Sequence, residues 1–424
     1  MEQYRNTSMQ MMEFIEQSPS VYHVISNIEK MLCEQGFIRL MENELWKLEF
    51  GCKYYVIRND SSVIAFSIGN KGEHGFRIVA AHSDSPVFKI KNNPEMAIEN
   101  RYLSLNTEKY GGMIISSWLD RPLSIAGRVV VDKGDGLETR LVNIDRDLLV
   151  IPNLAIHMNR DINKGYTYNP QKDMIPLFGT ASDKGIFEDM MAEAAGVSKE
   201  NILGEDLFLY NRMKGCVCGA MGEYIASPKL DDLQCAYAVT SAFINSGQTK
   251  GINMCCIFDN EEVGSRTAQG ADSDFLACTM ERIYCALGYN REEYLMAVGN
   301  SFMISADNAH GVHPNHTEKA DPTNRPYLNG GIVIKSNANQ KYTTDAYSQA
   351  KMISICKKAD VPYQLYANRS DIEGGSTLGN ISVSHVSLHT VDIGLAQLAM
   401  HSSCETGGIR DTEYLIQALK VFWE

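Results

Sequence analysis

The sequence predicts an α/β protein in which helices flank a sheet, with a β-rich domain inserted into the chain. In the first and last parts of the chain, short apolar runs of strand length alternate with runs of helical period. Between about residue 92 and residue 227, short β-like runs alternate instead with Gly, Asn, Asp and Pro turns. The length of 424 residues allows two to three domains at about 150 residues each. We therefore expect one discontinuous domain, residues 1–91 and 228–424, around an insertion, residues 92–227.

The first predicted helix covers residues 21–32, where apolar residues recur at helical spacing after Ser20 as the N-cap. Two apolar runs, residues 54–57 and 63–66, flank a polar turn and predict a hairpin. Residues 76–81 are apolar and partly β-branched, which predicts a buried strand. The elements predicted in the rest of the chain are strands at residues 127–131 and 148–151, a helix at 233–243, strands at 254–258 and 302–305, and a helix at 415–422.

The composition is that of an ordinary globular protein, with 44% hydrophobic and 21% charged residues. Asp and Glu number 52 against 39 Lys and Arg, which gives a formal net charge of -13. A nucleic-acid partner requires a basic surface field, and this charge balance argues against one.

The cysteines point to the compartment of the protein. There are 11, an odd number, and they are scattered along the chain without a CxxC pair. This pattern predicts reduced thiols in a cytoplasmic protein. The N-terminal segment has no basic flank before an apolar core, and no apolar run approaches the ~18 residues that span a bilayer. We therefore expect a cytoplasmic chain without a membrane partner.

Polar clusters directly follow three of the predicted strands. In open α/β sheets ligands bind beyond the carboxyl ends of the strands, so we expect these clusters to meet. A further carboxylate pair, Asp231–Asp232, opens a predicted helix. The side chains at the three strand ends are those of His82 and Asp84, of Asp259, Asn260, Glu261 and Glu262, and of Asp307.

Each cluster also has a structural explanation when it is taken alone. Asp231 or Asp232 could cap the helix, and the Glu261–Glu262 pair could lie in a solvated loop. His82 could be a hydrogen-bonded histidine at a strand end. Capping and solvation do not explain polar groups at successive strand ends, so the combination favours a metal site.

A series of segments, in matching order and spacing along nearly the whole chain, carries a family resemblance. The segments are AAHSDSP, EKYGG, WLDRPLSIAGRV, IPNLAIHMNRD, SPKLDDL, DNEEVGS, SADNAHGVHPN, VIKSNANQKY, GGSTLGNIS and LAMHSSCET. A single short motif would be weak evidence, whereas the ordered series is strong. On these segments the chain resembles the M18 metalloaminopeptidases, a family that includes aspartyl aminopeptidase.

The resemblance implies a mixed sheet of the di-metal exopeptidase type, an inserted dimerisation domain, and a tetrahedral homododecamer built from dimers. It also implies two divalent ions, zinc above all, although imidazoles and carboxylates suit cobalt or manganese as well. The implied metal ligands are His82, Asp231, Glu262, Asp307 and His401. Asp231 would bridge the ions. One ion would also take His82 and Asp307, and the other would take Glu262 and His401.

Three residues receive other catalytic roles from the resemblance. Asp84 would orient the imidazole of His82, as carboxylates next to metal-bound histidines do. Glu261 would act as the general base toward a water that bridges the ions and attacks the scissile carbonyl. His157 would reach the active site of a neighbouring subunit; a buried structural histidine is the alternative.

Substrate contacts are assigned by the resemblance to Lys335 and Tyr342. Lys335 is the candidate partner of an acidic substrate side chain, or else an ordinary exposed lysine. Ser376 and Thr377 could bind substrate or only shape a glycine turn.

The chain departs from the family pattern at a few positions. Lys229 stands where Arg is common, Pro122 where Asp is common, and Ser403–Cys404 where Ile-Arg is common, beside the expected ligand His401. His310 and His313 fall in a shared segment and receive no role. None of these differences removes an expected ligand or the base.

The predicted function is hydrolysis of the N-terminal residue of peptides, with a preference for acidic N-termini. The alternative specificity is for neutral residues of the leucine type. A two-metal deacylase or carboxypeptidase could use similar ligands but is not expected to share EKYGG or VIKSNANQKY. An inactive scaffold would be expected to lose Glu261 or a ligand, and the chain retains them.

Overall fold

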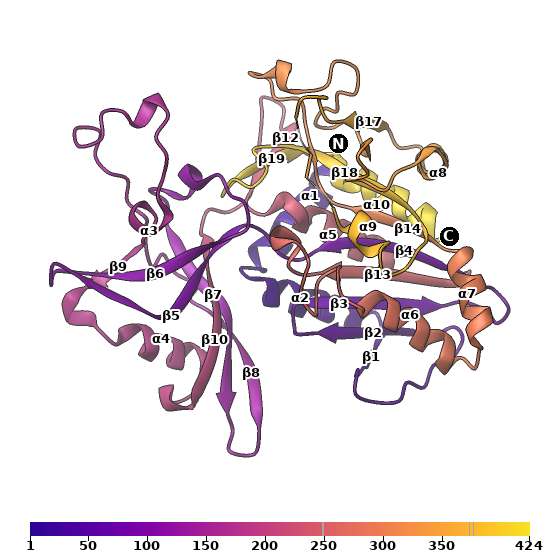
Figure 1. The fold of residues 1–424 in the computed structure, drawn as a ribbon, viewed down its shortest axis with the longest axis horizontal. Coiled ribbons are helices and arrows are strands. Elements are labelled where there is room, and N and C mark those ends of the chain that lie inside the picture. Colours follow the sequence, from indigo (N-terminus) through magenta and orange to yellow (C-terminus); the bar gives the residue numbers. More distant parts are fainter. Residues whose placement is uncertain (248–249, 373, 376) are drawn as a thin grey trace.

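The computed structural model describes residues 1–247, 250–372, 374–375 and 377–424. Figure 1 shows two bodies, each built on its own sheet, with both chain termini on the body of the larger sheet. The larger sheet has 13 strands and the smaller one has 6. Helices pack against both faces of the larger sheet, which mixes parallel and antiparallel pairs. The predicted α/β class, with a mixed sheet flanked by helices, is confirmed.

The centre of the larger sheet is parallel. Its main strand order is β1-β2-β3-β13-β4-β14-β18-β19-β12-β11. Strand β4 runs parallel to β13 on one side and to β14 on the other, so these three strands end at the same edge. The strands of this sheet are β1 (Ile38–Leu40), β2 (Lys53–Arg58), β3 (Ser62–Ile68), β4 (Phe76–His82), β11 (Cys216–Cys218), β12 (Tyr224–Ser227), β13 (Ile252–Phe258), β14 (Phe302–Ala306), β15 (Ala309–His310), β16 (Ile332–Ser336), β17 (Tyr363–Ala367), β18 (His389–Leu398) and β19 (Glu405–Gly408).

Successive side chains of the central strands alternate between two hydrophobic cores. On β4, Val79 enters one core, whereas Ile78 and Ala80 enter the other. Helices α1, α2, α5, α8 and α10 line the first core, and α6, α7 and α9 line the second. The helices of the chain are α1 (Glu2–Glu16), α2 (Val21–Glu34), α3 (Pro170–Asp173), α4 (Ile186–Ala195), α5 (Leu230–Ile244), α6 (Phe275–Ala286), α7 (Arg291–Gly299), α8 (Ala346–Ala359), α9 (Leu378–Ser382) and α10 (Asp411–Trp423).

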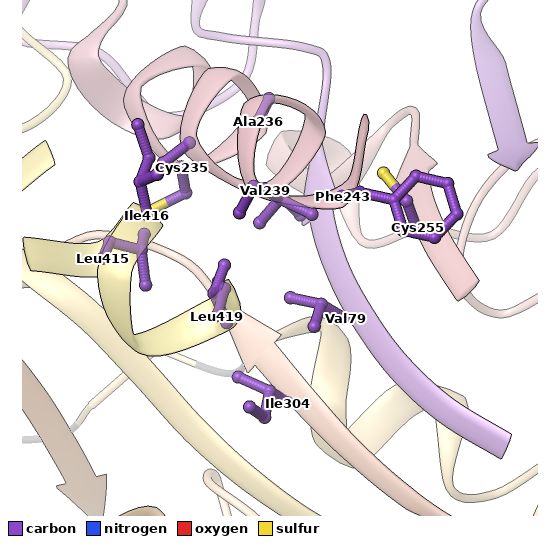
Figure 2. Packing of buried hydrophobic residues seen from close by; sticks show 14 of the residues in the cluster. Val79, Cys235, Ala236, Val239, Phe243, Cys255, Ile304, Leu415, Ile416 and Leu419 are labelled. Carbon is purple, nitrogen blue, oxygen red and sulfur yellow. The ribbon is translucent and has the colours of Figure 1, made fainter. Parts of the chain in front are cut away.

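Helices α5 and α10 close the first core over the strands. Figure 2 shows Val239 of α5 and Leu419 of α10 pointing toward Val79 and Ile304 of the sheet. Each of these four side chains is fully buried. The sequence produces this contact because α10 carries apolar residues on one face at helical spacing, whereas α5 is buried on nearly all sides.

The second sheet has its own core, separate from the two described above. Its strand order is β8-β7-β10-β5-β6-β9, and all its pairs are antiparallel. Helix α4 contributes Phe187 and Met191 to this core. The strands are β5 (Val87–Ile98), β6 (Tyr102–Tyr110), β7 (Leu123–Asp132), β8 (Leu137–Asn143), β9 (Leu177–Thr180) and β10 (Ile202–Asn211).

This sheet takes its strands from within residues 87–211, whereas β11 and β12 pair into the larger sheet. These ranges bound a sheet, and a domain can include residues beyond its sheet. The division of the chain at residues 92 and 227 therefore stays a prediction.

Asp206 on β10 joins the second sheet to the first body. Its carboxylate accepts hydrogen bonds from Lys89 (2.9 Å), Arg128 (3.1 Å) and the hydroxyl of Tyr22 on α2 (3.2 Å). Burial raises the pKa of Asp206, but Lys89 and Arg128 outweigh it, so the pKa is lowered and the group stays ionised. Arg128 also donates to the backbone oxygen of Asn59 in the turn between β2 and β3 (2.9 Å).

The predicted hairpin, the three strands before the polar clusters, the strand at residues 127–131 and the three helices are confirmed. The strand predicted at residues 148–151 is wrong, because this run forms only the isolated bridges Leu123–Leu149 and Val150–Leu177. Helix α1 was not predicted. Among the described residues, no helix is long and apolar enough to cross a membrane. All the cysteines are free thiols.

We expect Leu419→Ala to lower the free energy of unfolding by about 2–5 kcal/mol, because it leaves a cavity between α10, α5 and the sheet. Leu45→Ala is the matched control, since Leu45 is 94% exposed and its loss should change stability by less than about 0.5 kcal/mol. Thermal unfolding of both variants measures the difference. Equal melting temperatures would show that this contact does not support the core.

Candidate metal centre

Three strand ends and one helix start bring the polar clusters together. Strands β4, β13 and β14 are parallel and in register, so the residues that follow them lie at one edge of the sheet. Helix α5 begins at the same place, because Asp232 accepts a hydrogen bond from the backbone N–H of His82 (3.1 Å). The expected meeting of the clusters is confirmed.

Asp231 lies between two histidines. Its Oδ1 is 3.6 Å from Nε2 of His82, and its Oδ2 is 3.3 Å from Nε2 of His401. Nε2 of His401 is also 3.3 Å from a carboxylate oxygen of Glu262. The potential ligand atoms lie within 4.8 Å of one another in each of three overlapping groups. These groups are His82, Asp231, Asp232 and Asp307; Asp231, Glu262 and His401; and His82, Glu261 and Glu262.

The donor set fits divalent cations. Oδ1 of Asp231, Oδ1 of Asp232 and Oε1 of Glu262 are buried and accept no hydrogen bond from any described residue. Leaving a buried carboxylate oxygen without a partner is costly, and a metal ion would remove that cost. Imidazole nitrogens and carboxylate oxygens are ordinary ligands of zinc.

The electrostatics of the cluster point the same way. Burial raises the pKa of Glu262 well above its usual range, and the nearby Asp231 carboxylate adds to the shift. Burial also raises the pKa of Glu261, to about 8. Asp231 is the exception, because the adjacent imidazoles of His401 and His82 outweigh burial and lower its pKa. Adjacent carboxyls of this kind cannot all ionise without added positive charge, which a divalent cation would supply.

Asp84 supports the cluster without belonging to the three groups. Nδ1 of His82 is hydrogen-bonded to the backbone oxygen of Asp84 at 3.1 Å and lies 3.3 Å from its Oδ1, so Asp84 can fix the tautomer of the imidazole. The same carboxylate accepts hydrogen bonds from the backbone N–H groups of Glu261 and Glu262, each at 3.1 Å. Asp84 therefore holds one histidine and the loop that carries both glutamates.

Glu405 supports the cluster in a similar way to Asp84, and it is not among the site residues predicted from the sequence. It is buried and accepts hydrogen bonds from the backbone N–H groups of Asp231 (3.0 Å) and His401 (2.6 Å). The available signal was its place in the segment LAMHSSCET, four residues after His401. Asp232 was also underestimated, since it belongs to the same group as His82, Asp231 and Asp307.

One of the structural alternatives is wrong. His157 is exposed on the segment between β8 and α3, so it is not a buried structural histidine. Within this chain and its described residues, His157 makes no hydrogen bond or ion pair with the cluster. Helix α5 is interrupted at Asp231 and Asp232, whose backbones are non-helical, so capping of the regular helix by one of them stays a prediction.

Lys335 is not an ordinary exposed lysine, because only 2% of its surface is accessible. Its ammonium donates to the backbone oxygens of Asp307 (2.8 Å) and Asn308 (3.3 Å) and lies 3.6 Å from Oδ2 of Asp307. It also lies 5.2 Å from the ring centroid of Tyr342. Burial lowers the pKa of Lys335, but the Asp307 carboxylate outweighs it and the net shift is upward. Lys335 and Tyr342 thus stand together beside the cluster.

The remaining residues of interest have local partners. Thr377 donates its hydroxyl hydrogen to the buried carboxylate of Asp392 (2.6 Å), and Ser376 lies outside the described residues. The backbone N–H of Ser403 donates to the hydroxyl of Ser117 (2.9 Å). The ring centroid of His313 lies 5.1 Å from that of His316.

A family model described as aminopeptidase I zinc metalloprotease (M18) matches residues 14–423. The chain belongs to the M18 family. A probable M18 family aminopeptidase 2 of Clostridium acetobutylicum is 49% identical to it over 97% of both chains. The M18 members are metalloaminopeptidases, and this chain is therefore an enzyme of that class.

Solved structures agree with this assignment. A cryo-EM structure of the Ape4 and Nbr1 complex contains a chain 35% identical to this one, with a TM-score of 0.96 over 99% of this chain and 86% of that chain. The structure of the S. cerevisiae mApe1 dodecamer matches with 25% identity and a TM-score of 0.86, over 99% of this chain and 97% of that chain.

Removal of metal by a chelator should lower the melting temperature, because the buried carboxylates then repel one another. Zinc at a hundred times its dissociation constant should restore about 2.7 kcal/mol of stability for one site. His401→Ala should reduce this zinc-dependent gain, whereas His316→Ala, which alters an exposed histidine, should leave it unchanged. Differential scanning fluorimetry with and without zinc measures the gain, and an identical gain in all three proteins would contradict a ligand role of His401.

Proposed function

We propose that this M18 metalloaminopeptidase holds two zinc ions and removes the N-terminal residue of peptides. The proposal rests on the buried, unpartnered carboxylate oxygens of Asp231, Asp232 and Glu262 beside two histidines. His82 and Asp307 would hold one ion, with Asp231 shared between both ions. Glu262 and His401 would hold the other, as the two groups around Asp231 suggest.

Bound divalent ions would lower the pKa of a coordinated water and polarise the scissile carbonyl. Glu261 is the residue proposed to take the proton from the attacking water and pass it to the leaving amine. Its position supports this role, because Glu261 lies in one group with His82 and Glu262 and is not itself a proposed ligand. Asp84 would keep the base in place through its hydrogen bond from the Glu261 N–H.

We further propose that the chain assembles into a homododecamer, through dimers in which His157 reaches the active site of a neighbouring subunit. The related mApe1 has been solved as a dodecamer. Around His157, the apolar side chains of Leu154, Ile156 and Met158 are 53%, 48% and 73% exposed, which suits a subunit contact. The free cysteines favour the cytoplasm as its location.

Acidic N-terminal residues are the proposed preferred substrates, because the ammonium of Lys335 lies beside the predicted ligand Asp307. One observation favours a second candidate, a preference for neutral residues. The three N–H groups of the Lys335 ammonium already face two backbone oxygens and the carboxylate of Asp307, so a substrate carboxylate would compete with these partners.

Glu261→Gln should lower turnover by at least ~10²-fold, because the amide cannot accept the proton of the attacking water. Zinc content and assembly should stay as in the wild type, since Gln keeps the shape of Glu. Glu292→Gln, on the exposed surface of α7, is the matched control and should retain full turnover. Activity assays with zinc-loaded protein and metal analysis measure both properties. Full activity of Glu261→Gln would assign the base to another residue.

A chromogenic panel of Asp, Glu, Leu, Ala and Lys substrates should show the highest turnover for Asp and Glu. Lys335→Ala should then lower turnover of the acidic substrates at least ~10-fold more than that of the leucyl substrate, because it removes their charge partner. Lys319→Ala, in an exposed segment, is the matched control. Equal losses on all substrates would instead assign Lys335 to the support of Asp307, and a lead by Leu would select the second candidate.

A further inference from the structure

A short segment of the second sheet passes directly along the candidate metal centre. It comprises residues 110–114, and we call it the strap. It begins at Tyr110, the last residue of β6, which pairs with Val87 of β5. The strap therefore belongs to the second sheet at one end and touches the cluster of the first body along its length.

Tyr110 contacts the loop of the two glutamates through Asp84. Its hydroxyl donates to Oδ2 of Asp84 at 2.6 Å, and Nδ2 of Asn260 donates to the same hydroxyl at 2.8 Å. Oδ2 of Asp84 also accepts the backbone N–H of Glu262 at 3.1 Å. The Tyr110 hydroxyl is thus hydrogen-bonded both to Asp84, which anchors the loop, and to Asn260, which begins it.

Gly111 packs tightly against Glu262. A Cβ at this position would stand 3.1 Å from Cβ of Glu262 and 3.4 Å from its backbone oxygen. The backbone is in the left-handed region, with φ of +77°, which glycine adopts without strain. A side chain at residue 111 would therefore strain the backbone and press on Glu262.

The rest of the strap holds His401. A Cβ at Gly112 would lie 4.0 Å from Nδ1 of His401, so the ring faces this glycine. The backbone N–H of Ile114 donates to the backbone oxygen of His401 at 3.0 Å. His401 itself has a φ of 66°, an unusual conformation for a residue with a side chain, and this contact helps to hold it.

We infer that the strap is a positioning element through which the second sheet fixes Glu262 and His401, the pair proposed to hold one of the two ions. The inference rests on the proposed two-zinc function. It assigns a role to residues that are not themselves proposed as metal ligands. Tyr110 and Gly111 are positioning residues, because they act on the ligands through Asp84 and through packing. Gly111, Gly112 and Ile114 contact Glu262 and His401 among the predicted ligands, whereas Tyr110 acts through Asp84, which also faces His82. The ion of His82 and Asp307 should therefore depend less on Gly111 than on Tyr110.

Zinc titration of the chelated full-length chain, followed by calorimetry, tests the inference without an activity readout. Glu262→Gln identifies the binding step that belongs to the site of Glu262 and His401. Tyr110→Phe and Gly111→Ala should weaken this step by about 10–100-fold, the usual effect of residues that support metal ligands. In Gly111→Ala the other step should change by less than about threefold. Tyr110→Phe also frees Asp84, which faces His82, so in that variant the other step should weaken as well, by a smaller factor than the first.

Two controls separate positioning from a general effect on the sheet. Tyr210→Phe removes a hydroxyl of the same sheet that bonds to Asn143 (2.8 Å) rather than to the site. Gly134→Ala places a side chain at a φ of +85°, with no atom within 4 Å of its Cβ. Both should bind two ions as the wild type does, even where the melting temperature falls.

The outcomes distinguish the two proposals. If wild-type protein binds two ions and the strap variants bind both ions equally well, the inference is overturned and the two-zinc function stands. If Gly111→Ala loses both steps to the same extent, a local role toward Glu262 and His401 is also overturned. If the wild-type chain does not bind two ions, the two-zinc function fails and the inference falls with it.

Discussion

Concentrated negative charge inside the protein is the constraint on which the rest of the structure depends. Asp231, Asp232 and Glu262 are brought into one cluster with oxygens that no described residue satisfies. Burial and mutual repulsion raise the pKa of Glu262, so the cluster is unfavourable without added positive charge. The described residues supply histidines and one buried ammonium, that of Lys335 beside Asp307. This excess of buried negative charge favours a bound cation, in agreement with the zinc metalloprotease family to which the chain belongs.

The surrounding structure holds these charges in place through backbone hydrogen bonds. Asp84 accepts the N–H groups of Glu261 and Glu262, and Glu405 accepts those of Asp231 and His401. Each supporting carboxylate thus anchors two residues of the cluster at once. Fixing ligands through their backbone leaves their side-chain oxygens free for a metal, which is how supporting residues tune such sites.

Local pattern explains where prediction from the sequence succeeded and where it failed. The three strands before the polar clusters were predictable, because they are buried on both faces and read as continuous apolar runs. Residues 148–151 have the same local character but find only isolated bridges, since pairing depends on a neighbouring strand. Helix α1 was missed, because its buried face, including Met11 and Ile15, is defined by packing against α5 and α10.

The sequence by itself determined the α/β class, the family and the residue types that carry the chemistry, because these follow from local runs and ordered motifs. Only the tertiary structure decided which residues contact and support these chemically active side chains. Glu405 bonds to a residue 174 positions away, and Tyr110 to one 26 positions away across two sheets. Lys335 could be read as exposed until its strand was placed against Asp307. Such contacts depend on how distant segments pack, and local periodicity holds no information about that packing.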